Sequence, residues 1–158
     1  MNNENTIVVF DKLVEQARII VGNQKQSRSE KLKALCDQLH AKVEEFDWVG
    51  FYLANPADQE LVLGPFTGEP TEHTHIPYGR GICGQSAETQ QTFVVQDVGQ
   101  AENYLSCSAN VKAEIVVPIM KNGSFAGQID IDSHEQNSIT QEHRQMLEEI
   151  CAIAADLF

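Results

Sequence analysis

Hydrophobic residues recur at helical spacing near both ends of the chain. Between residues 7 and 21 the apolar positions follow a period of three to four, and Gly22 then provides a natural stop. Residues 27–46 begin with a capping box, Ser-x-x-Glu, and continue as one apolar stripe. Thr140 is placed to cap a third amphipathic segment that runs to the last residue. These patterns predict two helices at the start of the chain and one at its end.

The middle of the chain changes to patterns typical of strands. Residues 48–53 and 61–63 are rich in β-branched and aromatic side chains, and each run is followed by a turn signal that contains proline. A glycine-rich turn at residues 79–81 leads into a short predicted helix, and residues 92–95 have the composition of another strand. We therefore expect two neighbouring strands, a short helix and a further strand.

A β-hairpin follows an irregular segment. The apolar runs 114–120 and 124–131 flank Asn122-Gly123, a pair that favours a tight hairpin turn. The order of elements predicts an α+β fold with a central, mainly antiparallel sheet. The N- and C-terminal helices would cover one face of this sheet, and the loops of the other face would form a ligand pocket. No repeat or linker interrupts residues 1–158, so we expect one domain.

Composition restricts the possible partners. The 158 residues carry 11 basic and 23 acidic side chains, a formal net charge of −12, which repels nucleic-acid phosphates and anionic lipid headgroups. We therefore expect neither a nucleic acid nor a membrane as partner. Residues 1–5 lack the basic and apolar regions of a secretion signal, so a cytoplasmic location is expected.

The four cysteines are too few for a disulfide scaffold and differ in context. Cys36 and Cys151 lie on apolar helical stripes, which indicates core thiols. Cys83 lies near the start of the short helix, where free amides and the helix dipole would stabilise a thiolate. Cys107 lies in a polar segment without periodicity, a context that suits an accessible nucleophile.

Three acidic residues are expected to share one pocket. Asp130 and Asp132 alternate along a strand end, so their side chains point to the same face. Glu114 opens the partner strand of the same hairpin. Such a cluster suits a cation site or a proton donor, although each residue could also be an ordinary charge at a strand end.

A second constellation combines His73 and His75 with Cys83 and Cys107. Two imidazoles and two thiolates could hold zinc or copper. The spacing is not that of a standard zinc motif, so we expect no metal ion at these residues.

Several segments resemble the free methionine-(R)-sulfoxide reductases, which are single GAF domains. The resemblance lies in residues 48–53, 61–66, 76–84, 113–119 and 129–133, in that order along most of the chain. It implies thiol-dependent reduction of free L-methionine-(R)-S-oxide to methionine, with no bound cofactor. Cys107 matches the family's nucleophile, and Cys83 would resolve the sulfenic acid to a disulfide that thioredoxin reduces.

The resemblance also implies the residues that bind the substrate. The acids Glu114, Asp130 and Asp132 would hold its amine and favour protonation of the sulfoxide oxygen, and Trp48 and Tyr52 would line the pocket for its methyl group. A polarised S=O bond is the better electrophile, so carboxyl groups near a thiolate make chemical sense. GAF domains often pair through their terminal helices, so a homodimer is a further expectation.

Two departures from the family pattern leave alternatives open. His73 occupies the position of the main resolving cysteine, and Ser108 replaces the aspartate that follows the nucleophile. Cys83 could then be the only resolver, or an external thiol could reduce the sulfenic acid. The alternative function is a catalytically impaired GAF module that binds a small ligand or senses redox state through Cys83 and Cys107.

Overall fold

The computed structural model describes residues 3–105 and 108–158. Its helices are α1 (Asn3–Gly22), α2 (Arg28–Lys42), α3 (Gly81–Thr89) and α4 (Gln141–Ala154), with short 3-10 turns at Val98–Gln100 and Ala155–Leu157. Its strands are β1 (Trp48–Asn55), β2 (Glu60–Thr67), β3 (His75–Pro77), β4 (Phe93–Val95), β5 (Ala113–Lys121) and β6 (Ser124–Ser133). In these described ranges no helix has the length and apolar character needed to cross a lipid bilayer.

The six strands form one antiparallel sheet in the order β3-β2-β1-β6-β5-β4. The predicted hairpin joins β5 and β6, where Lys121 pairs with Ser124. Asn122 and Gly123 have φ values of 51° and 80°, the left-handed conformation that a two-residue hairpin turn requires. The predicted α+β class and antiparallel sheet are confirmed.

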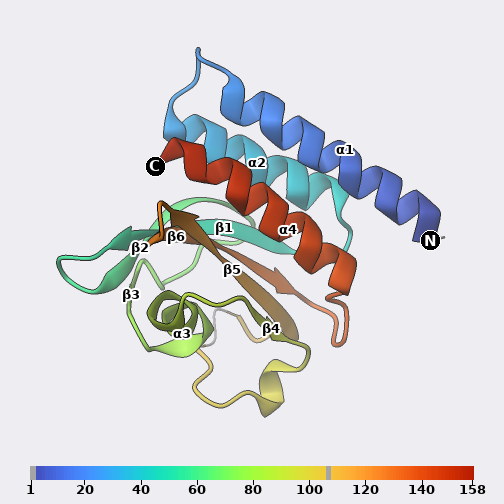
Figure 1. Cartoon of the computed structure of the whole chain (residues 1–158). Helices are drawn as coiled ribbons and strands as arrows, with labels where there is room; N and C mark the ends of the chain where they lie inside the picture. The colour runs from blue at the N-terminus through green and yellow to red at the C-terminus, as the bar shows by residue number, and fades with distance from the viewer. Residues whose placement is uncertain (1–2, 106–107) are drawn as a thin grey trace.

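The helices divide between the two faces of the sheet (Figure 1). Helices α2 and α4 pack on one face, α1 covers them as an outer layer, and α3 lies on the opposite face. The prediction that the terminal helices share one face is correct, with the refinement that α1 packs mainly on α2 and α4. Cys36 and Cys151 are buried in this helical layer, as expected.

Alternation along the strands separates two cores. On β1, Val49 and Phe51 face the helical layer, whereas Trp48 and Tyr52 belong to the core on the α3 side. On β6, Ile129 lies in the helical core. The even-numbered residues of this strand, including the two aspartates, therefore point towards α3.

Strand β2 is longer than predicted because it continues through Gly64-Pro65 to Thr67. The pairing of β1 with β2 shifts register between Gly50 and Tyr52, which places Pro65 in an irregularity of the ladder. On the other edge of β2, strand β3 pairs only with residues 60–62. Pro65 therefore has no partner in β3, and its missing N–H breaks no hydrogen bond to that strand. Strand β3 lies just before the glycine-rich turn, in a segment where the sequence predicted no strand.

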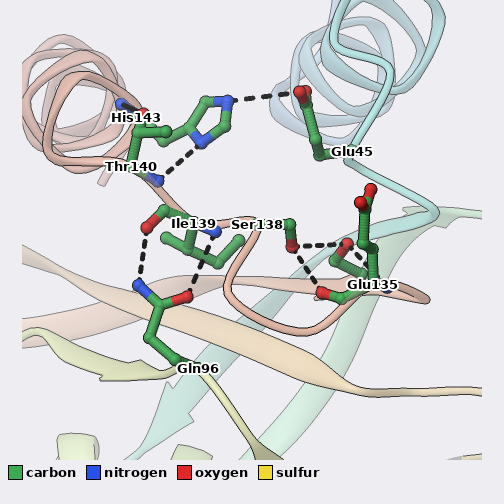
Figure 2. A network of polar contacts seen from close by, with 8 residues as sticks. Glu45, Gln96, Glu135, Ser138, Ile139, Thr140 and His143 are labelled. Atoms are coloured by element: carbon green, nitrogen blue, oxygen red, sulfur yellow. Dashed lines mark hydrogen bonds and ion pairs between the residues drawn. The ribbon is translucent and has the colours of Figure 1, made fainter.

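Side-chain contacts fix the segment that enters α4 (Figure 2). Gln96 Nε2 donates to the Ile139 carbonyl at 2.6 Å, and the Ile139 N–H donates to Gln96 Oε1 at 3.3 Å. The predicted cap is present: the His143 N–H donates to Thr140 Oγ1 at 3.1 Å. His143 completes a capping box, because its Nδ1 accepts from the Thr140 N–H at 3.0 Å while its Nε2 lies 3.6 Å from a Glu45 oxygen.

Candidate active site

Three carboxyl groups lie together on the α3 side of the sheet. Glu114 on β5 is directly opposite Asp132 on β6, and Asp130 lies on the same face two residues earlier. All three residues are buried: the exposed fraction is 3% for Glu114, 1% for Asp130 and 1% for Asp132. Like charges directly opposite each other destabilise a sheet, so this arrangement costs stability and is typical of a functional site.

Cys83 of α3 faces this acidic cluster. Its Sγ, one oxygen of Glu114 and one oxygen of Asp130 all lie within 4.8 Å of one another. Gln128 on β6 fixes the helix above the sheet, since its Nε2 donates to the Cys83 carbonyl at 3.1 Å. Three different elements therefore bring a thiol and carboxyl groups to one point.

Burial dominates the protonation of this cluster. It raises the pKa of Asp130 well above its usual range, with the neighbouring Asp132 adding to the effect. It raises the pKa of Asp132 to about 6. It also raises the pKa of Cys83, and the carboxyl groups of Asp130 and Glu114 raise that pKa further. The expectation of a Cys83 thiolate is therefore wrong for this arrangement: burial and the nearby acids outweigh the helix N-terminus, and the thiol keeps its proton.

Two aromatic residues of β1 form a wall beside the acids. The indole N–H of Trp48 donates to the Glu69 carbonyl at 2.9 Å, and the hydroxyl of Tyr52 donates to the His73 carbonyl at 2.8 Å. Gly50 lies between them, and a Cβ there would lie 2.3 Å from Cη2 of Trp48. The glycine therefore leaves the space that the indole occupies.

A small cavity of about 10 Å³ lies beside the cluster and is lined by Tyr52, Ile76, Arg80, Gly81, Ile82, Cys83, Leu105, Glu114 and Asp130. A second cavity of about 50 Å³ is lined in part by Trp48, Asp132 and Ser108. Leu105 and Ser108 are the described residues on either side of residues 106–107. Cys107, the predicted nucleophile, lies outside the described residues, so its role stays a prediction.

Asn103 holds the glycine-rich turn, which sequence reasoning missed. Its side-chain oxygen accepts from the Gly81 N–H at 3.0 Å, and its Nδ2 donates to the Gly79 carbonyl at 2.8 Å. Gly81 has a φ of +65°, and a Cβ there would lie 2.7 Å from Cβ of Leu105. Asn103 gave no signal in the sequence, because a contact 22 residues away follows no local pattern. Gln128 was missed for the same reason.

The alternative metal constellation is not assembled in the part of the chain that the structure describes. The potential metal-ligand group found there consists of Cys83, Glu114 and Asp130, without either histidine. His75 is on the edge strand β3 and is exposed, and the main chain of His73 is held by Tyr52. The histidines and Cys83 therefore do not form one described site.

Comparison with known proteins identifies the family. Residues 25–158 match the GAF domain family. The chain is 41% identical to GAF domain-containing protein A of Dictyostelium discoideum over 105 residues. This aligned region covers 66% of this chain and 65% of that protein. It is 35% identical to the free methionine-R-sulfoxide reductase of Escherichia coli over 114 residues. This aligned region covers 72% of this chain and 67% of that protein. The match spans only 61% of the yeast protein of the same name.

A solved structure supports the same assignment. The free methionine-R-sulfoxide reductase of Neisseria meningitidis, determined in complex with its substrate, superposes with a TM-score of 0.91 at 30% identity and covers 100% of this chain and 92% of that one. The chain therefore belongs to the GAF domain family and, within it, to the free methionine-R-sulfoxide reductases.

Proposed function

We propose that the protein reduces free L-methionine-(R)-S-oxide to methionine with thiols as the source of electrons. The observation that carries this proposal is the buried cluster of three carboxyl groups facing Cys83. It occurs in a chain whose sequence and fold match those of named reductases, one of them solved with its substrate. A buried, mutually repelling set of acids needs a cation, and the free amino acid brings one in its ammonium group.

The acids explain a preference for the free amino acid. Oδ1 of Asp130 and Oδ1 of Asp132 are buried and have no hydrogen-bond partner among the described residues. An ammonium group would donate to them and offset their repulsion. A methionine sulfoxide within a polypeptide has no such group. The cavity of about 10 Å³ is far smaller than an amino acid, so binding requires its lining to move apart.

The chemistry requires a nucleophile and a proton donor. In the proposal the thiolate of Cys107 attacks the sulfoxide sulfur, and a carboxyl group protonates the oxygen. Asp130 suits the second role because burial raises its pKa well above the usual range of a carboxyl group, which favours its protonated form. The S–O bond of the substrate breaks, and its protonated oxygen ends on the Cys107 sulfur as the hydroxyl group of a sulfenic acid. The substrate sulfur gains two electrons and leaves as methionine, and Cys107 is oxidised by two electrons.

Cys83 is the proposed resolving thiol. Its attack on the sulfenic acid would form a disulfide and release water, and thioredoxin would then reduce that disulfide. Burial and the neighbouring acids raise the pKa of Cys83, which makes its thiolate scarce. Entry of the substrate ammonium would lower that pKa, so resolution is favoured in the loaded pocket.

The test is NADPH consumption with thioredoxin and thioredoxin reductase. Wild type should turn over the R-sulfoxide and not the S-sulfoxide, and Cys107→Ser should lose turnover with both thioredoxin and dithiothreitol. Cys83→Ser should lose the thioredoxin-dependent rate and keep activity with dithiothreitol. Cys151→Ser, on the helical face, is the matched control and should behave as wild type. Full activity of Cys107→Ser would refute the mechanism.

A second candidate function is a ligand-binding module without turnover. It is supported by His73 and Ser108 at the two positions where the family pattern has a cysteine and an aspartate. Calorimetry separates the two functions: binding of methionine sulfoxide without catalysis by any thiol donor would support the module. Turnover that depends on Cys107 would exclude it.

The wider setting is also part of the proposal. The 158 residues would form one GAF domain in the cytoplasm, where the buried free thiols Cys36 and Cys151 stay reduced. A homodimer through α1 is supported by its exposed apolar side chains Ile7, Val8 and Ile19. Light scattering of wild type and of Ile19→Lys tests the dimer, which the charge should dissociate.

A further inference from the structure

We propose that Cys83, Glu114 and Asp130 form a binding site for a soft divalent cation such as Zn²⁺, which occupies the pocket in place of the substrate ammonium. The site goes beyond the proposed reaction. It is tested by direct binding and therefore does not depend on catalysis.

Three potential ligand atoms lie at nearly the spacing that a zinc ion requires. Sγ of Cys83 and one oxygen each of Glu114 and Asp130 lie within 4.8 Å of one another. Around tetrahedral zinc, with Zn–S near 2.3 Å and Zn–O near 2.1 Å, neighbouring ligand atoms are separated by about 3.5 Å. The three atoms therefore need to approach one another by no more than about 1.3 Å to reach the spacing of zinc ligands.

An unsatisfied atom points to a missing ligand. Asp130 is 1% exposed, and its Oδ1 has no hydrogen-bond partner among the described residues. Asp130 lines the small cavity together with Cys83 and Glu114. A bound cation would neutralise charge on this buried carboxyl group and reduce the repulsion among the acids.

The size and chemistry of the cavity favour an ion over a larger ligand. Its volume of about 10 Å³ is close to the minimum that holds one water molecule, and a metal ion is no larger. One thiolate among carboxylates suits zinc or cadmium better than magnesium, which prefers oxygen ligands throughout. Arg80 also lines the cavity, but its side chain is exposed and can turn to solvent.

Binding involves no redox change. The cation forms bonds to Sγ and to two carboxylate oxygens, and the thiol proton of Cys83 leaves to solvent. A Cys83 sulfur held by a metal ion is no longer free to attack a sulfenic acid. The ion and the substrate ammonium would also compete for Glu114 and Asp130.

The experiment uses Cd²⁺ as a spectroscopic probe on the full, reduced chain. Wild type should show a thiolate-to-cadmium charge-transfer band that saturates at one equivalent. Cys83→Ser should lose the band, and Asp130→Asn, which keeps the side-chain volume, should weaken binding by at least about tenfold. Cys151→Ser, on the helical face, and the double variant His73→Gln/His75→Gln are the matched controls and should bind as wild type does. Circular dichroism verifies that each variant is folded.

Three outcomes would overturn the site: no band in wild type, a band that persists in Cys83→Ser, or a band that is lost in either control. Competition gives a further check, since methionine sulfoxide should weaken the apparent affinity for Cd²⁺. A protein that binds Cd²⁺ in this pattern but fails to reduce the sulfoxide would refute the proposed function and leave the metal site standing. A protein that reduces the sulfoxide but shows no Cd²⁺ band would refute the metal site and leave the proposed function standing.

Discussion

Replacing Asp132 by asparagine should stabilise the protein at neutral pH. The side chain is 1% exposed, and burial raises its pKa from 3.8 to about 6. This difference of about two pH units corresponds to about 3 kcal/mol of preference for the neutral form in the folded state. Asparagine is a neutral side chain of the same shape, and its amide can donate to the facing carboxyl group of Glu114.

The sign of the effect follows from the direction of the shift. A carboxyl group whose pKa is raised by folding contributes its stability while it is protonated, below about pH 4. That stability is lost as the pH rises through about 6. At pH 7.5 the wild-type protein is therefore destabilised by the full free energy of keeping Asp132 ionised in a buried position. Asp132→Asn has no such charge. The variant should be more stable by up to about 3 kcal/mol at pH 7.5, and the difference should shrink towards zero near pH 4.

Urea denaturation measures this difference directly. Trp48 is the one tryptophan in the sequence and pairs with residue 132 across β1 and β6, so circular dichroism should accompany its fluorescence. Asp11→Asn on the exposed face of α1 removes the same charge and should change the free energy of unfolding by less than about 0.5 kcal/mol. A variant less stable than wild type at pH 7.5, or a difference that does not change with pH, would refute the electrostatic reasoning.

Three further changes test other parts of the structure. Gly50→Ala places a Cβ 2.3 Å from the Trp48 ring, so it should cost about 1–3 kcal/mol and shift the indole emission; an unchanged spectrum and stability would contradict the packing. His143→Gln should flatten the loss of stability below about pH 6.5, because burial lowers the pKa of His143 and its neutral ring accepts the cap hydrogen bond, whereas glutamine does not titrate. Asn103→Ala removes two hydrogen bonds to the glycine-rich turn, so amide exchange at Gly81 should become faster in mass spectrometry while exchange in α4 stays unchanged.

Features set by local chemistry could be predicted from the sequence. The Asn122-Gly123 hairpin and the Thr140 cap follow from turn and capping preferences, which act over a few residues. The meeting of Glu114 with Asp132 also follows, because alternation fixes the face of each strand once the hairpin sets its register.

Features set by distant contacts could not be predicted. Pro65 continues a strand because a register shift in the pairing of β2 with β1 accommodates it, and the sequence around the proline does not reveal that shift. The protonation of Cys83 was predicted with the wrong sign because the helix start is visible in the sequence, whereas the acids that face it come from strands more than 30 residues away. The roles of Cys107 and of the substrate-binding residues remain predictions.

The stability effect and the two ligands proposed for the pocket have one physical origin. The sheet buries Glu114, Asp130 and Asp132 together, so a charged Asp132 costs electrostatic free energy at neutral pH. Any cation of suitable size recovers part of that free energy when it binds, and an ammonium group and a metal ion differ mainly in whether they also engage the Cys83 sulfur. A neutral side chain in place of Asp132 removes this electrostatic cost from the free protein. A cation then gains less binding free energy, because it neutralises less charge. Stabilisation of the free protein and loss of affinity for cations should therefore occur together in Asp132→Asn, as expected when a site trades stability for binding.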